Sequence, residues 1–177
     1  NALGDVTASG NFSTAIGYSA TSSGVSSFAA GSYAFAGADA STAIGRNSAG
    51  NGSTTATGAG AMALGGSYAS GTDSFAAAIA SNSTSYGATG ANSIAIGDRA
   101  KATATHATAI GTSVTASQVD GAVAMGSSST ASGLGTFATG YLNIASGHYS
   151  QAIGYGANTA NIYGKFAKSS GYFSNYA

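Results

Sequence analysis

The stretch N-S-I-A-I-G at residues 92–97 decides the fold of this chain. In an extended segment Ile94 and Ile96 lie two residues apart and point to one face, whereas Ala95 points to the other. Gly97 then lets the backbone turn, because glycine adopts conformations that other residues avoid. The same unit of alanine, a large apolar residue and glycine recurs at residues 2–4, 15–17, 43–45, 63–65, 109–111, 124–126 and 152–154, with weaker copies at 29–31, 78–80 and 138–140. The chain is therefore a repeat protein.

The spacing of the repeats predicts the architecture. Most copies follow one another after 13 to 15 residues, and a second small-residue position, usually glycine, lies about seven residues after each copy. Such a unit is too short for a helix-pair repeat, which needs more than about 30 residues. It fits one coil of a β-solenoid, with two short strands, two tight corners and the next coil stacked in parallel. We expect an all-β, parallel β-solenoid (a β-roll) of about 11 coils.

Two steps of the repeat are longer than the others, from residue 45 to 65 and from residue 80 to 97. They indicate lengthened corners, or in the first case an extra half-coil. The alternation within the coils predicts that the larger residues point inward, with Leu3, Thr14, Ile16, Phe28 and Ile44 as the first inward-facing candidates.

So thin a roll implies association between chains. One or two Ile-sized groups per coil contribute ~1.5–3 kcal/mol each when fully buried, whereas ordering one residue costs ~1–2 kcal/mol of backbone entropy. On these magnitudes an isolated roll would be only marginally stable. The low charge of the chain also offers little protection against association. We expect a cyclic homo-oligomer, with a trimer favoured. Its interface is predicted at the alanine faces, which comprise Ala15, Ala43, Ala63, Ala95, Ala109, Ala124 and Ala152.

The C-terminal residues depart from the repeat. We predict a repeat domain over residues 1–154 and a C-terminal cap or docking segment over residues 155–177, which holds six of the 17 aromatic residues. An exposed aromatic end suits docking onto another subunit, because the last coil of a solenoid leaves an open strand edge. The candidates for end docking are Tyr163, Phe166, Tyr172, Phe173 and Tyr176.

The composition excludes several classes of function. Five Lys or Arg residues balance five Asp residues, and no basic stripe exists, so nucleic acid is not an expected partner. No apolar run is long enough to span a bilayer, so we expect no direct membrane insertion of this segment. Threonines 54, 55 and 57 suggest a weaker hypothesis, ice binding, because flat threonine rows order water.

No catalytic, cofactor or metal site can be argued from the sequence. His106 and His148 lack a nearby carboxylate or a metal-spaced partner, and the carboxylates are scattered along the chain. The glycine run at residues 58–61 lacks the lysine and the strand–loop–helix context of a phosphate loop. We therefore expect no enzyme activity, no cofactor and no metal.

The run N-S-I-A-I-G-D-R-A-K-A at residues 92–102, with A-I-G recurring every 14 residues or so, resembles the head repeats of trimeric autotransporter adhesins, the YadA-like heads. The resemblance covers roughly residues 1–154. It implies a left-handed parallel β-roll that trimerises, is extracellular or on the cell surface, and attaches to host or abiotic surfaces. The implied partners are the chain itself and a host matrix protein or a surface glycan.

One departure keeps an alternative open. The neck motif and heptad stalk of that family do not follow residue 154. The alternative function is a self-assembling subunit of an extracellular filament or a phage fibre, which uses the same coil.

Overall fold

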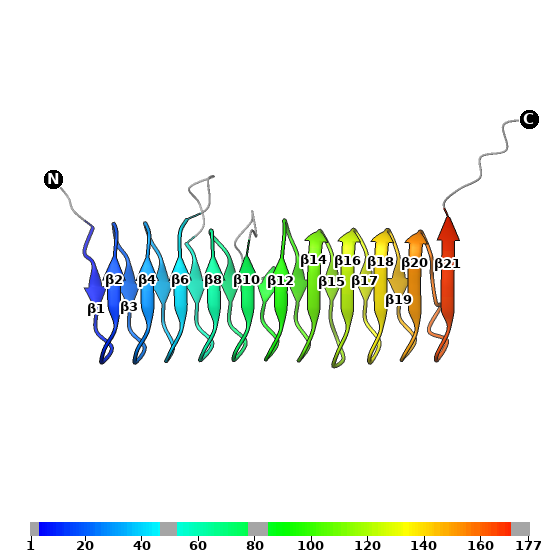
Figure 1. Cartoon of the computed structure of the whole chain (residues 1–177), viewed down its shortest axis with the longest axis horizontal. Coiled ribbons are helices and arrows are strands. Elements are labelled where there is room, and N and C mark those ends of the chain that lie inside the picture. Colours follow the sequence, from blue (N-terminus) through cyan, green and yellow to red (C-terminus); the bar gives the residue numbers. More distant parts are fainter. Residues whose placement is uncertain (1–3, 47–52, 78–84, 171–177) are drawn as a thin grey trace, which may run out of the picture.

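The computed structural model of the chain describes residues 4–46, 53–77 and 85–170. These residues form a straight rod of stacked coils (Figure 1). Each coil gives one short strand to each of two parallel sheets, so that neighbouring strands within a sheet are alternate strands of the chain. The prediction of an all-β parallel solenoid of about 11 coils is confirmed, since the larger sheet has 11 strands.

The strands are short, and every named pair is parallel. Sheet A consists of β1 (Thr7–Ala8), β3 (Thr21–Ser22), β5 (Phe35–Ala36), β7 (Thr55–Ala56), β9 (Tyr68–Ala69), β11 (Gly87–Ala88), β13 (Lys101–Ala102), β15 (Thr115–Ala116), β17 (Thr130–Ala131) and β19 (Ile144–Ala145). Sheet B consists of β2 (Thr14–Ile16), β4 (Phe28–Ala30), β6 (Thr42–Ile44), β8 (Met62–Leu64), β10 (Phe75–Ala77), β12 (Ile94–Ile96), β14 (Thr108–Thr112), β16 (Val123–Ser127), β18 (Phe137–Tyr141), β20 (Gln151–Tyr155) and β21 (Phe166–Ser170). The strands of sheet B therefore lengthen from three residues in the first six coils to five residues from β14 onward.

The register of sheet B places equivalent residues of successive coils in straight rows. Ala95 pairs with Ala76 on one side and with Ala109 on the other, so the alanines form one continuous ladder. The residues before and after each alanine form two further rows, which point to the opposite face. Because the pairing never shifts, one alternation pattern decides the environment of the whole sheet.

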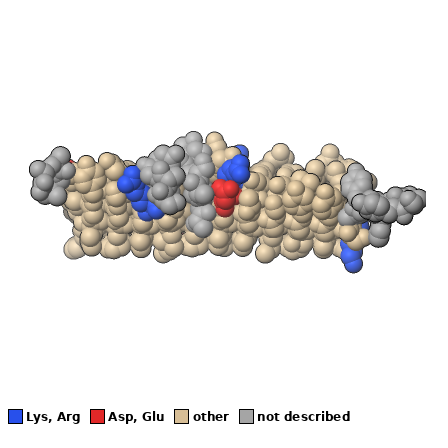
Figure 2. All heavy atoms as spheres, turned by 90° about the horizontal axis from the view of Figure 1, so that it is seen from above, with Lys and Arg blue, Asp and Glu red and all other residues tan. Residues whose placement is uncertain are grey.

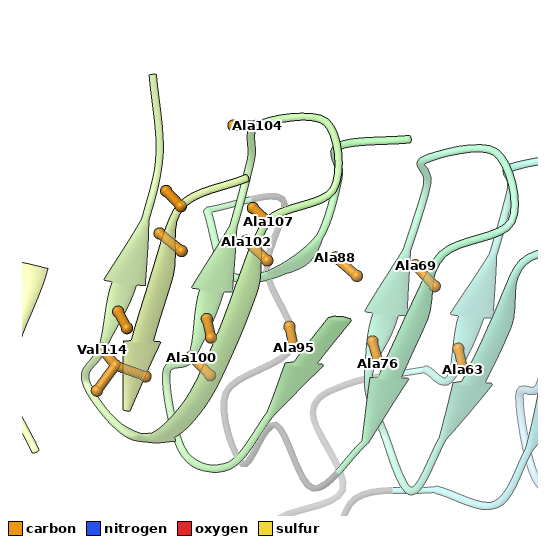
Figure 3. Close-up of a cluster of buried hydrophobic side chains, with 14 of the residues drawn as sticks. Ala63, Ala69, Ala76, Ala88, Ala95, Ala100, Ala102, Ala104, Ala107 and Val114 are labelled. Atoms are coloured by element: carbon orange, nitrogen blue, oxygen red, sulfur yellow. The ribbon is translucent and has the colours of Figure 1, made fainter. Parts of the chain in front are cut away.

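The apolar core of the rod consists almost entirely of alanine, and buried serine and threonine side chains complete the interior. In Figure 3 the alanines of sheet B, such as Ala63, Ala76 and Ala95, and those of sheet A, such as Ala69 and Ala88, point into the space between the sheets. These side chains are fully buried, and Val114 is the largest side chain that is fully buried. The two sheets therefore lie so close together that little more than a methyl group fits between them.

The predicted direction of the side chains is wrong. Ile16 and Ile44 are 57% and 41% exposed, Thr14 is exposed and Phe28 is half-buried, so none of them fills the interior. Leu3 lies outside the described residues. The interior of so thin a coil has no room for an isoleucine, so the small residue of each alternating pair turns inward and the large one outward.

The predicted oligomer interface at the alanine faces is wrong for the same reason. Ala15 is half-buried, and the other six residues are completely buried within the single chain, where they cannot contact a partner: Ala43, Ala63, Ala95, Ala109, Ala124 and Ala152.

The corners that follow sheet B, called upper corners after their position in Figure 1, depend on a column of glycines. Gly97, Gly111 and Gly126 have φ angles of 113°, 131° and 103°, in the region that side chains disfavour. A Cβ atom on Gly111 would also collide with the carbonyl oxygen of Gly126 in the next coil. Glycine is therefore required here for two reasons: the positive φ angle and the close approach of the two backbones.

The lower corners, which follow sheet A, use glycine differently. Gly24 and Gly147 have no left-handed φ angle, but a Cβ atom on either would collide with the carbonyl group of the next coil. The left-handed residue comes two positions later in the turn and is usually not glycine, for example Ser26 with a φ of 55° and Asn92 with a φ of 54°. The turn is closed by a backbone hydrogen bond, as from Ser27 N–H to Gly24 O at 3.3 Å.

The long step from residue 45 to 65 is a lengthened corner and not an extra half-coil. β6 pairs directly with β8, and only β7 lies between them in the chain. Arg46 and Ser53 form an antiparallel bridge at the base of this corner. The Thr54 hydroxyl is buried there, donates to Gly45 O at 2.6 Å and accepts from Gly66 N–H at 2.7 Å. Because Thr54 is buried, it cannot belong to a water-ordering surface row with Thr55 and Thr57.

The coil continues beyond residue 154. β21 pairs with β20 in the same register, with Ala152 opposite Ala167, and Asn158 bridges to Ile144 of sheet A. Asn143 joins these coils from the inside, because its amide donates to Gly154 O at 2.6 Å and its Oδ1 accepts from Ala157 N–H at 2.8 Å. Residues 155–170 thus follow the same two-sheet plan as the preceding coils.

Replacing Gly111 by alanine is expected to destabilise the rod strongly, because the new methyl group meets the Gly126 carbonyl and the backbone is held at a positive φ. Gly65→Ala is the matched control, since Gly65 also has a positive φ but no atom lies within 4 Å of its hypothetical Cβ. We expect Gly65→Ala to cost only the conformational penalty of ~1–2 kcal/mol. Thermal and urea unfolding followed by circular dichroism compare the two variants, and equal losses would contradict the steric argument.

Replacing Ala109 by leucine is expected to lower the free energy of unfolding by ~1–3 kcal/mol or more, because the interior cannot accept three further carbon atoms. The control is Thr115→Leu, which adds bulk to an outward position of sheet A. Urea unfolding measures both variants. A tolerated Ala109→Leu would show that the spacing between the sheets adapts.

Candidate interaction surfaces

The outer face of sheet B is an apolar strip along the rod. It carries the two rows that flank the alanine ladder, and large side chains in them are exposed, including Ile44 at 41%, Met62 at 41% and Ile94 at 38%. Among the described residues Lys168 is the one charged member of these rows. The rows comprise Thr14, Phe28, Thr42, Met62, Phe75, Ile94, Thr108, Val123, Phe137, Gln151 and Phe166, and Ile16, Ala30, Ile44, Leu64, Ala77, Ile96, Ile110, Met125, Thr139, Ile153 and Lys168.

The outer face of sheet A has a different chemistry. The first position of its strands carries Thr7, Thr21, Phe35, Thr55, Tyr68, Gly87, Lys101, Thr115, Thr130 and Ile144. Five of these ten residues are threonines, and their hydroxyl groups suit contact with water. The rod therefore has one apolar side and one largely polar side.

Charged side chains contribute little to either face. Figure 2, which looks down on the upper corners, shows few charged groups on a surface otherwise made of uncharged residues. At one upper corner Arg99 Nε lies 3.3 Å from Asp98 Oδ2, and the two side chains are 52% and 38% exposed. A pair this exposed stabilises the fold by well under ~1 kcal/mol.

Tyrosines form pairs between neighbouring coils at the corners. The ring centroids of Tyr18 and Tyr33 are 5.4 Å apart, and the Arg46 guanidinium lies 5.3 Å from the Tyr33 ring. Tyr141 and Tyr155 form a second pair at 5.2 Å, next to the apolar strip. Sequence reasoning missed these pairs, because a spacing of one repeat places two tyrosines in neighbouring coils without showing that their rings meet.

A third tyrosine pair, Tyr149 with Tyr163, lies on the lower corners at a centroid distance of 5.5 Å. Tyr163 is 72% exposed, and Phe166, which belongs to the apolar strip, is 59% exposed. The other residues predicted for end docking, Tyr172, Phe173 and Tyr176, lie outside the described residues. A docking role for the five residues remains a prediction.

The two histidines are corner residues. His106 occupies a left-handed turn position with a φ of 55°. His148 accepts a hydrogen bond on Nδ1 from Leu134 N–H in the preceding coil, at 2.9 Å. Within the described ranges, no three His, Cys, Asp or Glu side chains come together in a way that could hold a metal ion.

In the part of the chain that the structure describes, no helix is long and apolar enough to cross a membrane.

Comparison with known proteins supports the repeat assignment. A family model described as "YadA head domain repeat (2 copies)" matches residues 8–34, 22–48, 88–113 and 120–143, which together cover about half of the chain. Each matched segment spans about two coils of the two-sheet rod. No curated protein sequence matches the chain.

The contact between Tyr18 and Tyr33 leads to a testable prediction about the pKa of Tyr18. The hydrogen bond with the Tyr33 side chain raises the pKa of Tyr18 above its ordinary value, and the charge of Tyr33 and desolvation act in the same direction. Tyr33→Phe removes the partner hydroxyl, so Tyr18 should lose its proton at a lower pH than in the unaltered chain. NMR titration of the tyrosine Cζ signals measures this change. Tyr141→Phe is the control, and a Tyr18 titration that stays the same in Tyr33→Phe would contradict the assignment.

Proposed function

The chain belongs to the family of YadA head domain repeats, and from this premise we propose that it is the trimeric, non-catalytic head of a surface-exposed adhesive protein. The family is one of adhesins and not of enzymes, and adhesin heads of this kind are surface-exposed and trimeric. The structural observation that supports the proposal best is the apolar strip on the outer face of sheet B.

The strip is best covered by a partner that presents an equally long and flat apolar face. Its isoleucine, phenylalanine and methionine side chains lie on a flat face and remain partly in water in the single chain. Fully burying a fully exposed side chain of this size contributes ~1.5–3 kcal/mol, and these partly exposed side chains contribute a corresponding fraction each. The alanine core, by comparison, has few carbon atoms to bury. The strip runs through all 11 strands of sheet B, so a sister chain aligned with the rod can cover its full length. Three copies around an axis parallel to the rod bury every strip in a closed assembly.

The same arrangement leaves the adhesive surface outside. With sheet B turned toward the axis, the polar face of sheet A and the corners remain accessible along the assembly. These are the surfaces that we assign to attachment, with a host matrix protein or a surface glycan as the partner. The proposed attachment surface therefore lies on residues that the trimer does not need.

The double variant Ile44→Asp/Ile94→Asp tests the oligomer. Both side chains are exposed in the single chain, so the fold of each chain should persist while burial of two carboxylates prevents association. We expect the mass by light scattering to fall from three chains to one. The matched control, Thr115→Asp/Thr130→Asp, places the same charges on sheet A and should stay trimeric.

Two results would contradict the proposal. One is a monomeric unaltered chain at micromolar concentration, and the other is a trimer that survives the sheet B variant but not the sheet A control. Retained circular dichroism of the double variant excludes simple unfolding as the cause. Attachment of the trimer to immobilised matrix proteins, scored for both variants, separates loss of assembly from loss of adhesion.

A further inference from the structure

We propose that the lower corners near β19–β21 carry a binding platform for a neutral saccharide, formed by His148, Tyr149 and Tyr163. The proposal rests on the proposed adhesive function and names the chemical class of one partner. The platform lies at the corner between the two sheets.

The position of Tyr149 is costly for the fold. Its φ is 56°, in the left-handed region, and the residue is 52% exposed, so burial does not offset the strain. The equivalent turn position holds a smaller residue in most other coils, such as Gly135 and Asn92, which suit this conformation better. Phe12 and His106 are the other large residues at this position. A large apolar residue placed where it is both strained and exposed indicates a role outside folding.

The Tyr149 ring is held in place. A Cβ atom on Gly135 would lie 3.0 Å from Cδ1 and 3.3 Å from Cε1 of Tyr149, so the ring rests against the bare backbone of that glycine. On the other side, the ring of Tyr163 meets it at an interplanar angle of 69°. Two rings from successive coils are therefore oriented before any ligand arrives, which lowers the entropy cost of binding.

His148 supplies an oriented polar group beside the rings. Its Nδ1 accepts from Leu134 N–H at 2.9 Å, so in the neutral ring the proton resides on Nε2. The side chain is exposed, and Nε2–H is thus a donor available to a ligand. The two phenol hydroxyls can both donate and accept.

This combination fits a neutral saccharide better than other ligands. The apolar C–H face of a pyranose packs on an aromatic ring, while its hydroxyl groups bond to the imidazole and phenol groups. An extended peptide has no strand edge to extend here, because Tyr149 N–H donates to Leu134 O at 2.7 Å and His148 O accepts from Gly164 N–H at 2.8 Å. Lys165 is the one charged side chain among residues 143–166, so neither nucleic acid nor a polyanion is favoured.

Saturation-transfer difference NMR of the full chain with cellohexaose and with maltohexaose tests the proposal. We expect saturation transfer to at least one of these neutral probes, and a roughly tenfold weaker affinity for Tyr149→Ala and for Tyr163→Ala. His148→Gln should keep part of the affinity, because its amide retains a donor. Tyr18→Ala is the matched control, since Tyr18 is 46% exposed and also belongs to a tyrosine pair.

The platform is refuted if neither probe shows transfer, if only hexagalacturonate binds, or if Tyr18→Ala weakens binding as much as Tyr149→Ala does. Light scattering of the same samples keeps the two proposals apart. A trimer without saccharide binding refutes the platform alone, whereas saccharide binding by a monomer refutes the trimeric head and leaves the platform in place.

Discussion

The separation of the two sheets governs the whole rod. Because the space between the sheets admits few side chains larger than alanine or serine, nearly every fully buried apolar side chain is alanine. Apart from Val114, the larger apolar residues that the structure describes are at least partly exposed, which creates the strip on sheet B. Stacking of the coils brings the backbones of successive upper corners close together, so that Gly111 and most of its equivalents leave no room for a side chain.

Much of this architecture was predictable from the spacing of the sequence. The return of alanine, a large apolar residue and glycine every 13 to 15 residues predicted strands, corners and parallel stacking, all of which the structure contains. The alternation could not say which face is inside, because a period of two separates the faces without assigning them. The usual preference for burying the larger residue suggested Ile44, and the dimensions of the coil reversed it in favour of Ala43.

The surfaces were harder to predict than the fold. Once the alanines are placed inside, the large residues beside them must form the apolar strip. The sequence therefore identified the residues of the strip, but we predicted that they point inward. The tyrosine pairs depend on how corner side chains lean toward the preceding coil, as Tyr149 does over Gly135. Side-chain direction at a left-handed corner cannot be read from residue spacing, and neither can the hydrogen bond that fixes the protonated nitrogen of His148.

The lengthening of the strands in sheet B also has a mechanical meaning. The strands run across the rod, so tension along the axis pulls directly on the hydrogen bonds between coils. Each pair of neighbouring coils carries the whole tension. Within one such junction, the hydrogen bonds between the two coils divide the force among them. Junctions between five-residue strands, from β14 to β21, distribute it over more bonds than the three-residue junctions before them. A rod of this kind has a graded tensile strength, and its N-terminal coils yield first under drag.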